Sequence, residues 1–269
     1  MGTATNRPFA VVTDASSGIG FELAKQCVEH GFDVLVCADN VARLQEAAER
    51  LRAAGTRVEV VRADLATYEG NETLAHAVRA AGRPVDALLL NAGIGVNGKF
   101  VETSLDEELR SIGLNCAAVV HAAKRILPDM VARGSGRVLI TGSILSTAPG
   151  PYLAVYGATK AFDMSFAEAL RVELADTGVT VTVLQPGATD THFFERADME
   201  DTAVAQGKKD DPADVAKQGF EAMMKGKDSV IAASMRSKLQ GLAHEILPET
   251  VKARVQAQAA KPGSGTSRE

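Results

Sequence analysis

Tyr156 and Lys160 are the two side chains in this sequence whose types and spacing best suit proton transfer. They lie four residues apart in a segment of helical period, so they share one helix face and the ammonium can approach the phenol oxygen. A phenol normally titrates at about pH 10. A neighbouring cation favours the phenolate and lowers that pKa, which suits general acid and base catalysis.

Ser143 and Asn115 are two further polar candidates. Ser143 follows the apolar run Arg137–Thr141, and open α/β sheets bind ligands at the carboxyl ends of strands, so its hydroxyl could orient a substrate oxygen. Taken singly, a surface Tyr-Lys pair, a loop serine and a helix-breaking asparagine are ordinary features. Their combination favours an active site.

The segment Thr13–Gly20 is a glycine-containing turn between the apolar run Phe9–Val12 and a segment of helical period. A helix N-terminus exposes free N–H groups and the positive end of its dipole, and glycines let the backbone approach a pyrophosphate there. A glycine cluster alone indicates only a tight turn, but the order of strand, turn and helix predicts a dinucleotide site. Its candidate contacts are Thr13, Asp14, Ser16, Ser17, Gly18, Ile19 and Gly20.

The elements that must position these residues alternate between short apolar runs and amphipathic segments, which is the pattern of repeated βαβ units. We predict strands at Phe9–Val12, Asp33–Ala38, Arg57–Arg62, Val85–Leu90, Arg137–Thr141, Val179–Gln185 and Ser229–Ala232. The intervening helices are predicted from Phe21 to the capping Gly31 and at about Val41–Ala54, Thr67–Ala81, Leu105–Arg133, Tyr152–Asp176 and Pro212–Gly226.

The expected fold class is α/β, a single doubly wound Rossmann domain with a parallel sheet of about seven strands and helices on both faces. No linker rich in glycine, proline or serine interrupts Phe9–Ala232, so residues 1–260 are predicted as one domain.

Two segments stand apart from the repeated units. Residues 189–210 form the expected substrate loop, because a long insertion of mixed polarity often acts as a lid. An apolar helical stripe at 239–247 predicts a helical extension over 233–260, packed on the core or on a second subunit rather than on a membrane. Residues 261–269 are predicted as a disordered tail.

Composition and charge limit the function classes. The 269 residues carry 29 basic and 34 acidic side chains, a net charge of −5, and no basic cluster, which disfavours a nucleic-acid partner. No apolar run is long enough to cross a membrane and the start lacks the apolar core of a signal peptide, so a cytoplasmic location is expected. The three cysteines lack metal-type spacing and are expected as reduced, buried thiols, and no metal site is predicted.

Together these motifs resemble the short-chain dehydrogenase/reductase family of the classical type, whose turn reads T-G-x-x-x-G-x-G. The resemblance covers nearly the whole chain in the right order and spacing. Besides the turn, it rests on Asn91-Ala92-Gly93, Asn115, Ser143, Tyr156-x-x-x-Lys160, and Pro186-Gly187 with Thr189 and Thr191.

The resemblance implies an oxidoreductase that transfers a hydride between a nicotinamide cofactor and an alcohol or carbonyl substrate. It implies that Tyr156 is the acid and base, and that Asn115 holds a water in a proton relay through Lys160. The implied cofactor residues are Asn91, Ala92, Gly93, Tyr156, Lys160, Pro186, Gly187, Thr189 and Thr191, with Asp64 and Leu65 at the adenine.

Asp39, at the end of the second predicted strand, bears on the choice of cofactor. Members of the family that prefer NADP have an Arg at this place or a basic residue at the place of Ser17, and both are absent. A carboxylate near the adenosine ribose repels a 2′-phosphate and accepts hydrogen bonds from a free 2′-hydroxyl. NAD is therefore favoured over NADP, although Arg43 in the next helix could swing back towards a phosphate.

Asp14 is the main departure from the family pattern, because it replaces the first glycine of the turn. Aspartate tolerates a left-handed backbone, but it adds bulk and negative charge close to the dinucleotide. This supports an alternative, a catalytically weak or inactive dinucleotide-binding or sensor protein on the same fold. A third hypothesis, an isomerase or dehydratase, is disfavoured because such enzymes usually resemble longer relatives.

The expected partner is a small, apolar alcohol or ketone with one polar oxygen, because the candidate pocket residues are mostly apolar. They are Ile144, Leu145, Tyr152, Phe193, Phe194 and Met199, which would equally suit plain packing. The resemblance also implies a homodimer or homotetramer formed through the helices that carry Asn115 and Tyr156.

Overall fold

The computed structural model describes residues 7–232 and 249–266. Its centre is a parallel sheet in the order β3-β2-β1-β4-β5-β6-β7, which confirms the predicted fold class. The predicted strands are confirmed to within two residues at each boundary. They are β1 Phe9–Thr13, β2 Asp33–Ala38, β3 Val58–Arg62, β4 Ala87–Leu90, β5 Gly136–Thr141, β6 Val179–Pro186 and β7 Ser229–Ala232.

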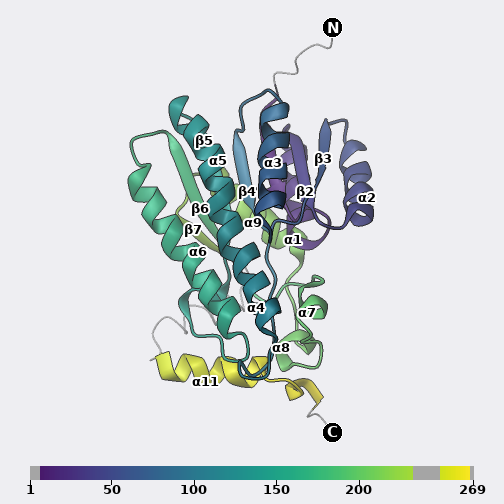
Figure 1. Cartoon of the computed structure of the whole chain (residues 1–269), viewed down its shortest axis with the longest axis vertical. Coiled ribbons are helices and arrows are strands. Elements are labelled where there is room, and N and C mark those ends of the chain that lie inside the picture. The colour runs from purple at the N-terminus through teal and green to yellow at the C-terminus, as the bar shows by residue number, and fades with distance from the viewer. Residues whose placement is uncertain (1–6, 233–248, 267–269) are drawn as a thin grey trace.

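Both faces of the sheet are covered by helices, which explains why the strand sequences are nearly continuous apolar runs. Alternate residues of β1 enter opposite cores, with Ala10 and Val12 on one side and Phe9 and Val11 on the other. The first core is covered by α1 Gly18–Glu29, α2 Val41–Arg52 and α9 Pro212–Met224. The second is covered by α3 Tyr68–Ala80, α5 Ala118–Ala132 and α6 Ala154–Glu173, which lie in front of the sheet in Figure 1.

The strand order reverses between β1 and β4, which are neighbours in the sheet. Open α/β sheets bind ligands outside the carboxyl ends of the strands at such a reversal. The glycine-containing turn leaves β1 there, and the loop that begins at Asn91 leaves β4. Thr13 joins the two, because its hydroxyl accepts hydrogen bonds from the backbone N–H groups of Asn91 (2.9 Å) and Ala92 (3.1 Å).

The prediction of one continuous helix over Leu105–Arg133 is wrong. The segment consists of α4 Leu105–Ile112, a π-helical turn over Gly113–Ala117, and α5. Within the turn, Asn115 accepts a hydrogen bond from the backbone N–H of Ile94 (3.0 Å) and donates one to its carbonyl (2.9 Å). These contacts with a loop 21 residues away favour a locally widened helix, which hydrophobic periodicity does not encode.

The ends of two other helices are set by their neighbouring residues. Helix α6 begins at Ala154, two residues later than predicted, because Tyr152 has a left-handed backbone (φ +64°). The predicted start of α9 at the Asp211-Pro212 pair is confirmed, with the Asp211 carboxylate accepting a hydrogen bond from the N–H of Ala213 (2.8 Å).

The loop and C-terminal segments gather at one end of the molecule. Two short helices, α7 Phe193–Arg196 and α8 Ala203–Gln206, lie within the predicted substrate loop, and α11 Glu249–Ala260 crosses the same end (Figure 1). Within the described ranges, none of the helices has the length and apolar character needed to cross a bilayer. The predicted helical stripe at 239–247 lies outside the described residues.

The predicted disordered tail is wrong for its first part. Residues Ser264–Thr266 form a short 3-10 helix. Asp201 orders this segment, because its carboxylate accepts a hydrogen bond from the N–H of Gly263 (2.6 Å) and its carbonyl accepts one from Gly265 (2.8 Å). Asp201 is about sixty residues away from this segment along the chain, so the composition of the segment could not predict its ordering. Residues 267–269 lie outside the described residues.

The three thiols are free, as predicted. Cys27 and Cys37 are buried, as predicted, whereas the prediction that Cys116 is buried is wrong, because it is partly exposed on the π-helical turn. Burial raises the pKa of Cys37 to about 12, with Asp14 and Asp39 adding to the effect, so this thiol stays neutral.

Candidate active site

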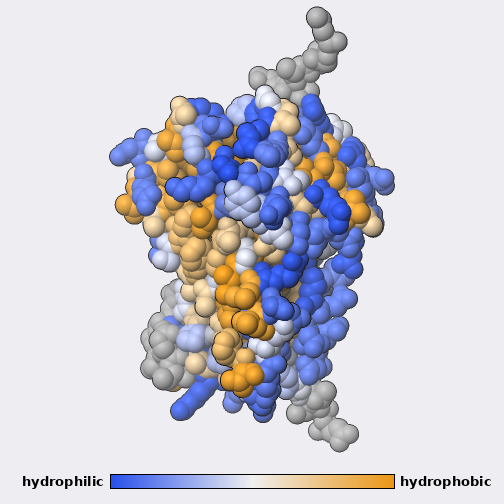
Figure 2. Space-filling view, viewed as in Figure 1, coloured by the Kyte–Doolittle hydropathy of each residue, from blue (hydrophilic) through white to orange (hydrophobic). Residues whose placement is uncertain are grey.

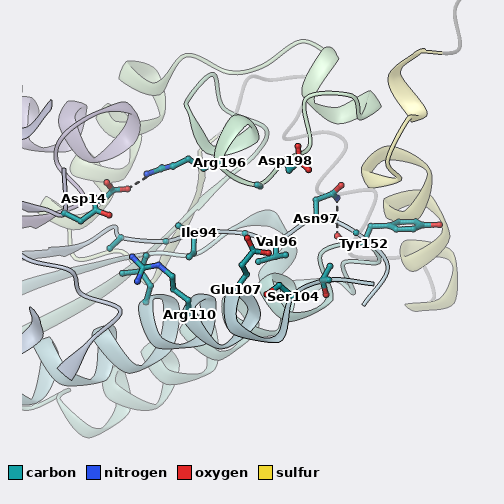
Figure 3. A pocket seen from close by; sticks show the side chains of 18 of the residues that line it. Asp14, Ile94, Val96, Asn97, Ser104, Glu107, Arg110, Tyr152, Arg196 and Asp198 are labelled. Atoms are coloured by element: carbon teal, nitrogen blue, oxygen red, sulfur yellow. Dashed lines mark hydrogen bonds and ion pairs between the residues drawn. The ribbon is translucent and has the colours of Figure 1, made fainter. Parts of the chain in front are cut away.

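Two adjoining cavities occupy the carboxyl end of the sheet. The larger, which Figure 3 shows from close by, has a volume of about 1010 Å³, and Asp39 and Asp64 are among its lining residues. The smaller has a volume of about 180 Å³ and contains the candidate proton-transfer residues. Asp14, Gly93 and Arg196 line both cavities, so one extended ligand could reach from one cavity into the other.

The turn after β1 has the backbone that a phosphate cradle requires. Gly18 has a left-handed backbone (φ +54°), and a Cβ on Gly20 would lie 2.0 Å from the Asp14 carbonyl oxygen, so no other residue fits there. Ser17 precedes α1 and makes no capping hydrogen bond with its side chain. The N–H groups of the first turn of α1 are therefore available to an anion, which fits a dinucleotide pyrophosphate.

One part of the larger cavity suits an adenosine group. Asp39, Asp64 and Leu65 line it, and Asp64 forms a bidentate pair with Arg110 of α4, with N–O distances of 2.8 and 3.0 Å. The hydrogen bonds from Arg110 hold the pKa of Asp64 below its usual range. Figure 3 shows Arg110 extending from its helix into this cavity. The carboxylates of Asp39 and Asp64 therefore both line this part of the larger cavity.

Tyr156 and Lys160 share one face of α6, as the spacing predicts. The Lys160 ammonium nitrogen lies 5.9 Å from the centroid of the Tyr156 ring and donates a hydrogen bond to the Thr141 carbonyl (2.8 Å). Desolvation raises the pKa of Tyr156, while Lys160 and a hydrogen bond with Ser143 lower it and Asp163 raises it further. The net direction is upward, because desolvation outweighs the effect of the cation. The predicted lowering of this pKa is therefore wrong, and Tyr156 is held as a neutral phenol.

Lys160 is almost completely buried and pairs with Asp163, one helical turn further along α6. Burial opposes the charged form of Lys160, but Asp163 and Tyr156 outweigh it and raise its pKa above the usual value. Burial also raises the pKa of Asp163, and the ammonium opposes that rise. We therefore treat the two as an ion pair.

Ser143 and Asn115 flank the Tyr-Lys pair from two other elements. Ser143 caps the N-terminus of a short 3-10 helix, Ile144–Thr147, and its hydroxyl accepts a hydrogen bond from the N–H of Leu145 (3.1 Å). Asn115 is fully buried, and a Cβ on Gly93 would lie 3.4 Å from both its Oδ1 and the Lys160 Nζ. Gly93 therefore lies against both of these polar side chains.

Asp14 adopts the left-handed backbone expected for it, with φ +50°. Its carboxylate lies 3.6 Å from the guanidinium of Arg196, which reaches across from α7 (Figure 3). Desolvation raises the pKa of Asp14 to about 6; Arg196 opposes this rise and Asp39 adds to it. The charge at this turn is therefore partly balanced by the substrate loop.

The structure brings most of the predicted site residues to the two cavities. The smaller is lined by Ser17, Gly18, Ile19, Asn91, Ser143, Tyr156, Lys160, Pro186, Gly187, Thr189 and Thr191, and the larger by Asp39, Asp64, Leu65 and Ala92. Four predicted residues line neither: Thr13, Ser16, Gly20 and Asn115. The contacts of Thr13, Gly20 and Asn115 described above hold the backbone that shapes the site.

The candidate substrate residues divide in a similar way. Ile144, Phe193, Phe194 and Met199 line the smaller cavity and Tyr152 the larger one. Leu145 lines neither and packs in an apolar cluster with Leu153 and Phe194. No group of three or more metal-ligating side chains occurs in the part of the chain that the structure describes.

Sequence reasoning missed four contributions to the site. Asp163 could have been found, because it lies three residues after Lys160 and so on the same helix face. No feature of the sequence near Asp14 indicated Arg196 as its partner. No local signal marks Arg110 or the α11 residues that line the smaller cavity, which are Gln256, Ala259 and Ala260.

Comparison with known proteins agrees with this geometry. The family model described as short chain dehydrogenase matches residues 8–201. A glycine betaine reductase of Emericella nidulans is 33% identical over 212 residues, which is 77% of this chain and 17% of that protein. An uncharacterized oxidoreductase of Staphylococcus epidermidis is 33% identical over 190 residues, or 71% of this chain and 81% of the relative.

Solved structures show the same fold. A short-chain dehydrogenase from Sphingobium yanoikuyae in complex with NADPH is 28% identical with a TM-score of 0.78, and the match covers 89% of this chain and 96% of that one. A short chain dehydrogenase/reductase from Burkholderia phymatum in complex with NAD is 24% identical with a TM-score of 0.80, covering 91% and 95% of the two chains.

Proposed function

Because the chain belongs to the short-chain dehydrogenase family, we propose that it is an oxidoreductase that transfers a hydride between a nicotinamide cofactor and an alcohol or carbonyl substrate. The observation that carries the proposal is the meeting of Ser143, Tyr156 and Lys160 in one cavity, next to a larger cavity of a size suited to a dinucleotide. A protein that only binds dinucleotides has no need of a phenol and an ammonium at that point.

The chain's own residues would handle the proton. The cofactor, when bound, supplies or accepts the hydride. Tyr156 donates a proton to the carbonyl oxygen during reduction and removes it from the hydroxyl during oxidation, while Lys160 stabilises the phenolate. The Ser143 hydroxyl orients the substrate oxygen. The ring of Phe193, 5.1 Å from that of Tyr156, helps to exclude water from the reacting atoms.

Replacing Tyr156 tests this proposal directly. Tyr156→Phe removes the transferable proton and keeps the ring, so turnover should fall to background on any alcohol or ketone that the parent accepts. The fold and dinucleotide affinity should change little, as measured by thermal melting and by calorimetric titration. Wild-type kcat in the purified variant would exclude Tyr156 as the acid and base.

We also propose that the cofactor is NAD rather than NADP, on the basis of Asp39 at the adenosine end of the larger cavity. Charge repulsion of a 2′-phosphate should make NAD bind about tenfold more tightly at moderate salt. The difference should shrink in Asp39→Ser, which keeps a polar side chain without charge. Equal or tighter binding of NADP by the parent, measured by calorimetry, would reverse the choice and point to Arg43.

The rival hypothesis, a dinucleotide sensor without turnover, is supported by the Asp14 carboxylate that lines both cavities. The two hypotheses differ in one observable. A sensor binds NAD(H) and stays inactive on a broad panel of alcohols and ketones, whereas an oxidoreductase shows cofactor-dependent absorbance changes with at least one of them. The apolar lining by Phe193, Phe194 and Met199 favours apolar carbonyl compounds for that panel.

We propose that the protein forms a homo-oligomer through the helical segment that carries Asn115, which begins with α4, and through α6, which carries Tyr156. Leu105, Leu109 and Ile112 of α4 are spaced to form one stripe, and all three are exposed, whereas the same helix buries Glu108 and Ser111. Figure 2 shows hydrophobic residues gathered over α4 on the face viewed. An apolar helix stripe of this kind is typical of an interface. A second copy of the chain is the proposed occupant.

A further inference from the structure

Asp163 is a buried carboxylate that the proposed reaction does not use. It is 0% exposed, and its Oδ2 lies 3.0 Å from the Nζ of Lys160, one helical turn earlier on α6. Its other oxygen, Oδ1, is also buried and accepts no hydrogen bond from the described residues. The nearby Lys160 ammonium is therefore what balances its charge.

Few other groups act on this pair. Tyr156 faces it from the same helix and the Cys116 thiol from the π-helical turn. Desolvation raises the pKa of Cys116 to about 11, with Asp163 adding to the rise and Lys160 opposing it, so the thiol is neutral at neutral pH. The Thr141 carbonyl of β5 completes the surroundings of the ammonium. The centre thus contains one positive and one negative charge.

Stability is a poor explanation for such a pair. Removing two charges from water costs several kcal/mol for each ion, and replacing a buried ion pair with apolar side chains is often neutral or stabilising. The position of Asp163, directly behind the lysine that faces the proposed acid and base, suggests a chemical role instead.

We propose that Asp163 is a positioning residue that balances the charge of Lys160 and thereby keeps Tyr156 in its neutral, proton-donating form. The inference rests on the proposed function and specifies which direction of the reaction is favoured. With the carboxylate present, the buried centre is neutral when the phenol is protonated and carries a charge of −1 when it is not. Without the carboxylate, proton loss takes the centre from +1 to neutral, which costs less in a buried site.

This charge balance favours carbonyl reduction over alcohol oxidation as the working reaction. Reduction needs the phenol as an acid, whereas oxidation needs the phenolate as a base. The residue leaves the equilibrium constant of the reaction unchanged. Asp163 instead keeps Tyr156 protonated up to a higher pH. Reduction should therefore persist to a higher pH than it would without Asp163.

An absorbance titration of tyrosine ionisation tests the inference without any substrate. The chain contains no tryptophan and three tyrosines, Tyr68, Tyr152 and Tyr156, so the signal of Tyr156 is obtained by subtracting the Tyr156→Phe variant. In Asp163→Asn the Tyr156 transition should move to lower pH by about one unit or more. A transition that stays in place or moves to higher pH would overturn the proposal.

Two further variants separate charge from packing. Asp163→Glu retains the charge and should keep the wild-type transition; a downward shift as large as that of the asparagine variant would show that packing, not charge, is responsible. Asp33→Asn is the matched control, because Asp33 is also buried and paired, with Arg83 at 2.7 Å, at the opposite end of the sheet. It should lower thermal stability and leave the Tyr156 transition unchanged.

Activity gives a second readout. The high-pH limit of ketone reduction should shift downward in Asp163→Asn by the same amount as the phenol transition, and an unshifted limit would contradict the proposal. If the asparagine variant does not fold, Asp163→Ser replaces it with the same expected shift. A shifted titration in a protein that turns over no alcohol or ketone would refute the proposed function and leave the charge-balancing role supported.

Discussion

Asp14 differs from the glycine of the family turn in two ways, its backbone strain and its negative charge. It occupies a left-handed backbone position where glycine is unstrained, and its carboxylate lies between the two cavities, 3.6 Å from Arg196. A cofactor that extends from one cavity into the other must pass this carboxylate. Its phosphates carry the same sign of charge, so Asp14 should weaken binding while Arg196 offsets part of the effect.

Acidification should therefore tighten cofactor binding. Since desolvation raises the pKa of Asp14 to about 6, lowering the pH through that value protonates the carboxylate and frees Arg196 to face the phosphates. Calorimetry should show tighter NAD⁺ binding at about pH 5 than at about pH 7.5, because the cofactor favours the protonated state of this group. Asp14→Gly should bind more tightly than the parent at neutral pH, lose this pH dependence, and benefit less at high salt.

Asp198→Gly is a suitable control for that experiment. Asp198 lines the larger cavity and also has a left-handed backbone (φ +50°), but lies apart from Asp14 in Figure 3. Its replacement should leave NAD⁺ affinity almost unchanged. Weaker binding in Asp14→Gly would instead identify the aspartate as a ligand of the cofactor ribose.

At the scale of elements, α11 closes the site from the end of the chain. Gln256 and Ala259 of this helix line the smaller cavity together with Tyr156 and the aromatic residues of α7. The loop after β4 is tied to it, because the Asn97 side chain donates hydrogen bonds to the carbonyls of Tyr152 (3.2 Å) and Ala260 (2.9 Å). Helix α11 is therefore expected to limit substrate size.

Enlarging a small side chain on α11 should change specificity without changing the chemistry. Ala259→Leu adds volume to a cavity of about 180 Å³, so KM for bulky ketones should rise several-fold more than KM for small ones. Cofactor affinity should be unaffected. Gln258→Leu places the same side chain at an exposed position of the same helix and should leave both KM values unchanged. Equal KM changes for large and small ketones would show that α11 does not border the substrate.

At the scale of the whole molecule, the exposed stripe on α4 is the feature that a monomer does not explain. Leu109→Glu places a charge at its centre and should reduce the oligomer to smaller species in analytical ultracentrifugation. The substitution is at the surface, so the free energy of unfolding of the subunit should change by no more than about 0.5 kcal/mol.

Val41→Glu provides the comparison, because Val41 is a similarly exposed valine at the start of α2, which covers the opposite face of the sheet. Its sedimentation should match that of the parent. A parent protein that already sediments as a monomer, or a Leu109→Glu variant that keeps the parent's mass, would exclude this face as the interface.

Sequence alone determined the features that depend on short-range patterns. The strand run Asp33–Ala38 matches the structure residue for residue, because a strand buried on both faces is a nearly continuous apolar run. The run Ser229–Ala232 also matches, although β7 is a partly exposed strand at the edge of the sheet. The helix spacing of Tyr156 and Lys160 and the left-handed backbone of Asp14 are likewise local properties. Most of the residues that the family motifs single out line the two cavities.

Tertiary structure decided whatever depends on partners far apart in the sequence. The π-helical turn at Asn115 follows from bonds to Ile94, and the ordering of residues 261–266 follows from bonds to Asp201. The Asp14–Arg196 pair joins residues that are distant along the chain, and only folding brings them within 3.6 Å. The energies of these contacts come from the burial of polar groups and from the approach of opposite charges. A pattern of neighbouring residues predicts neither of these.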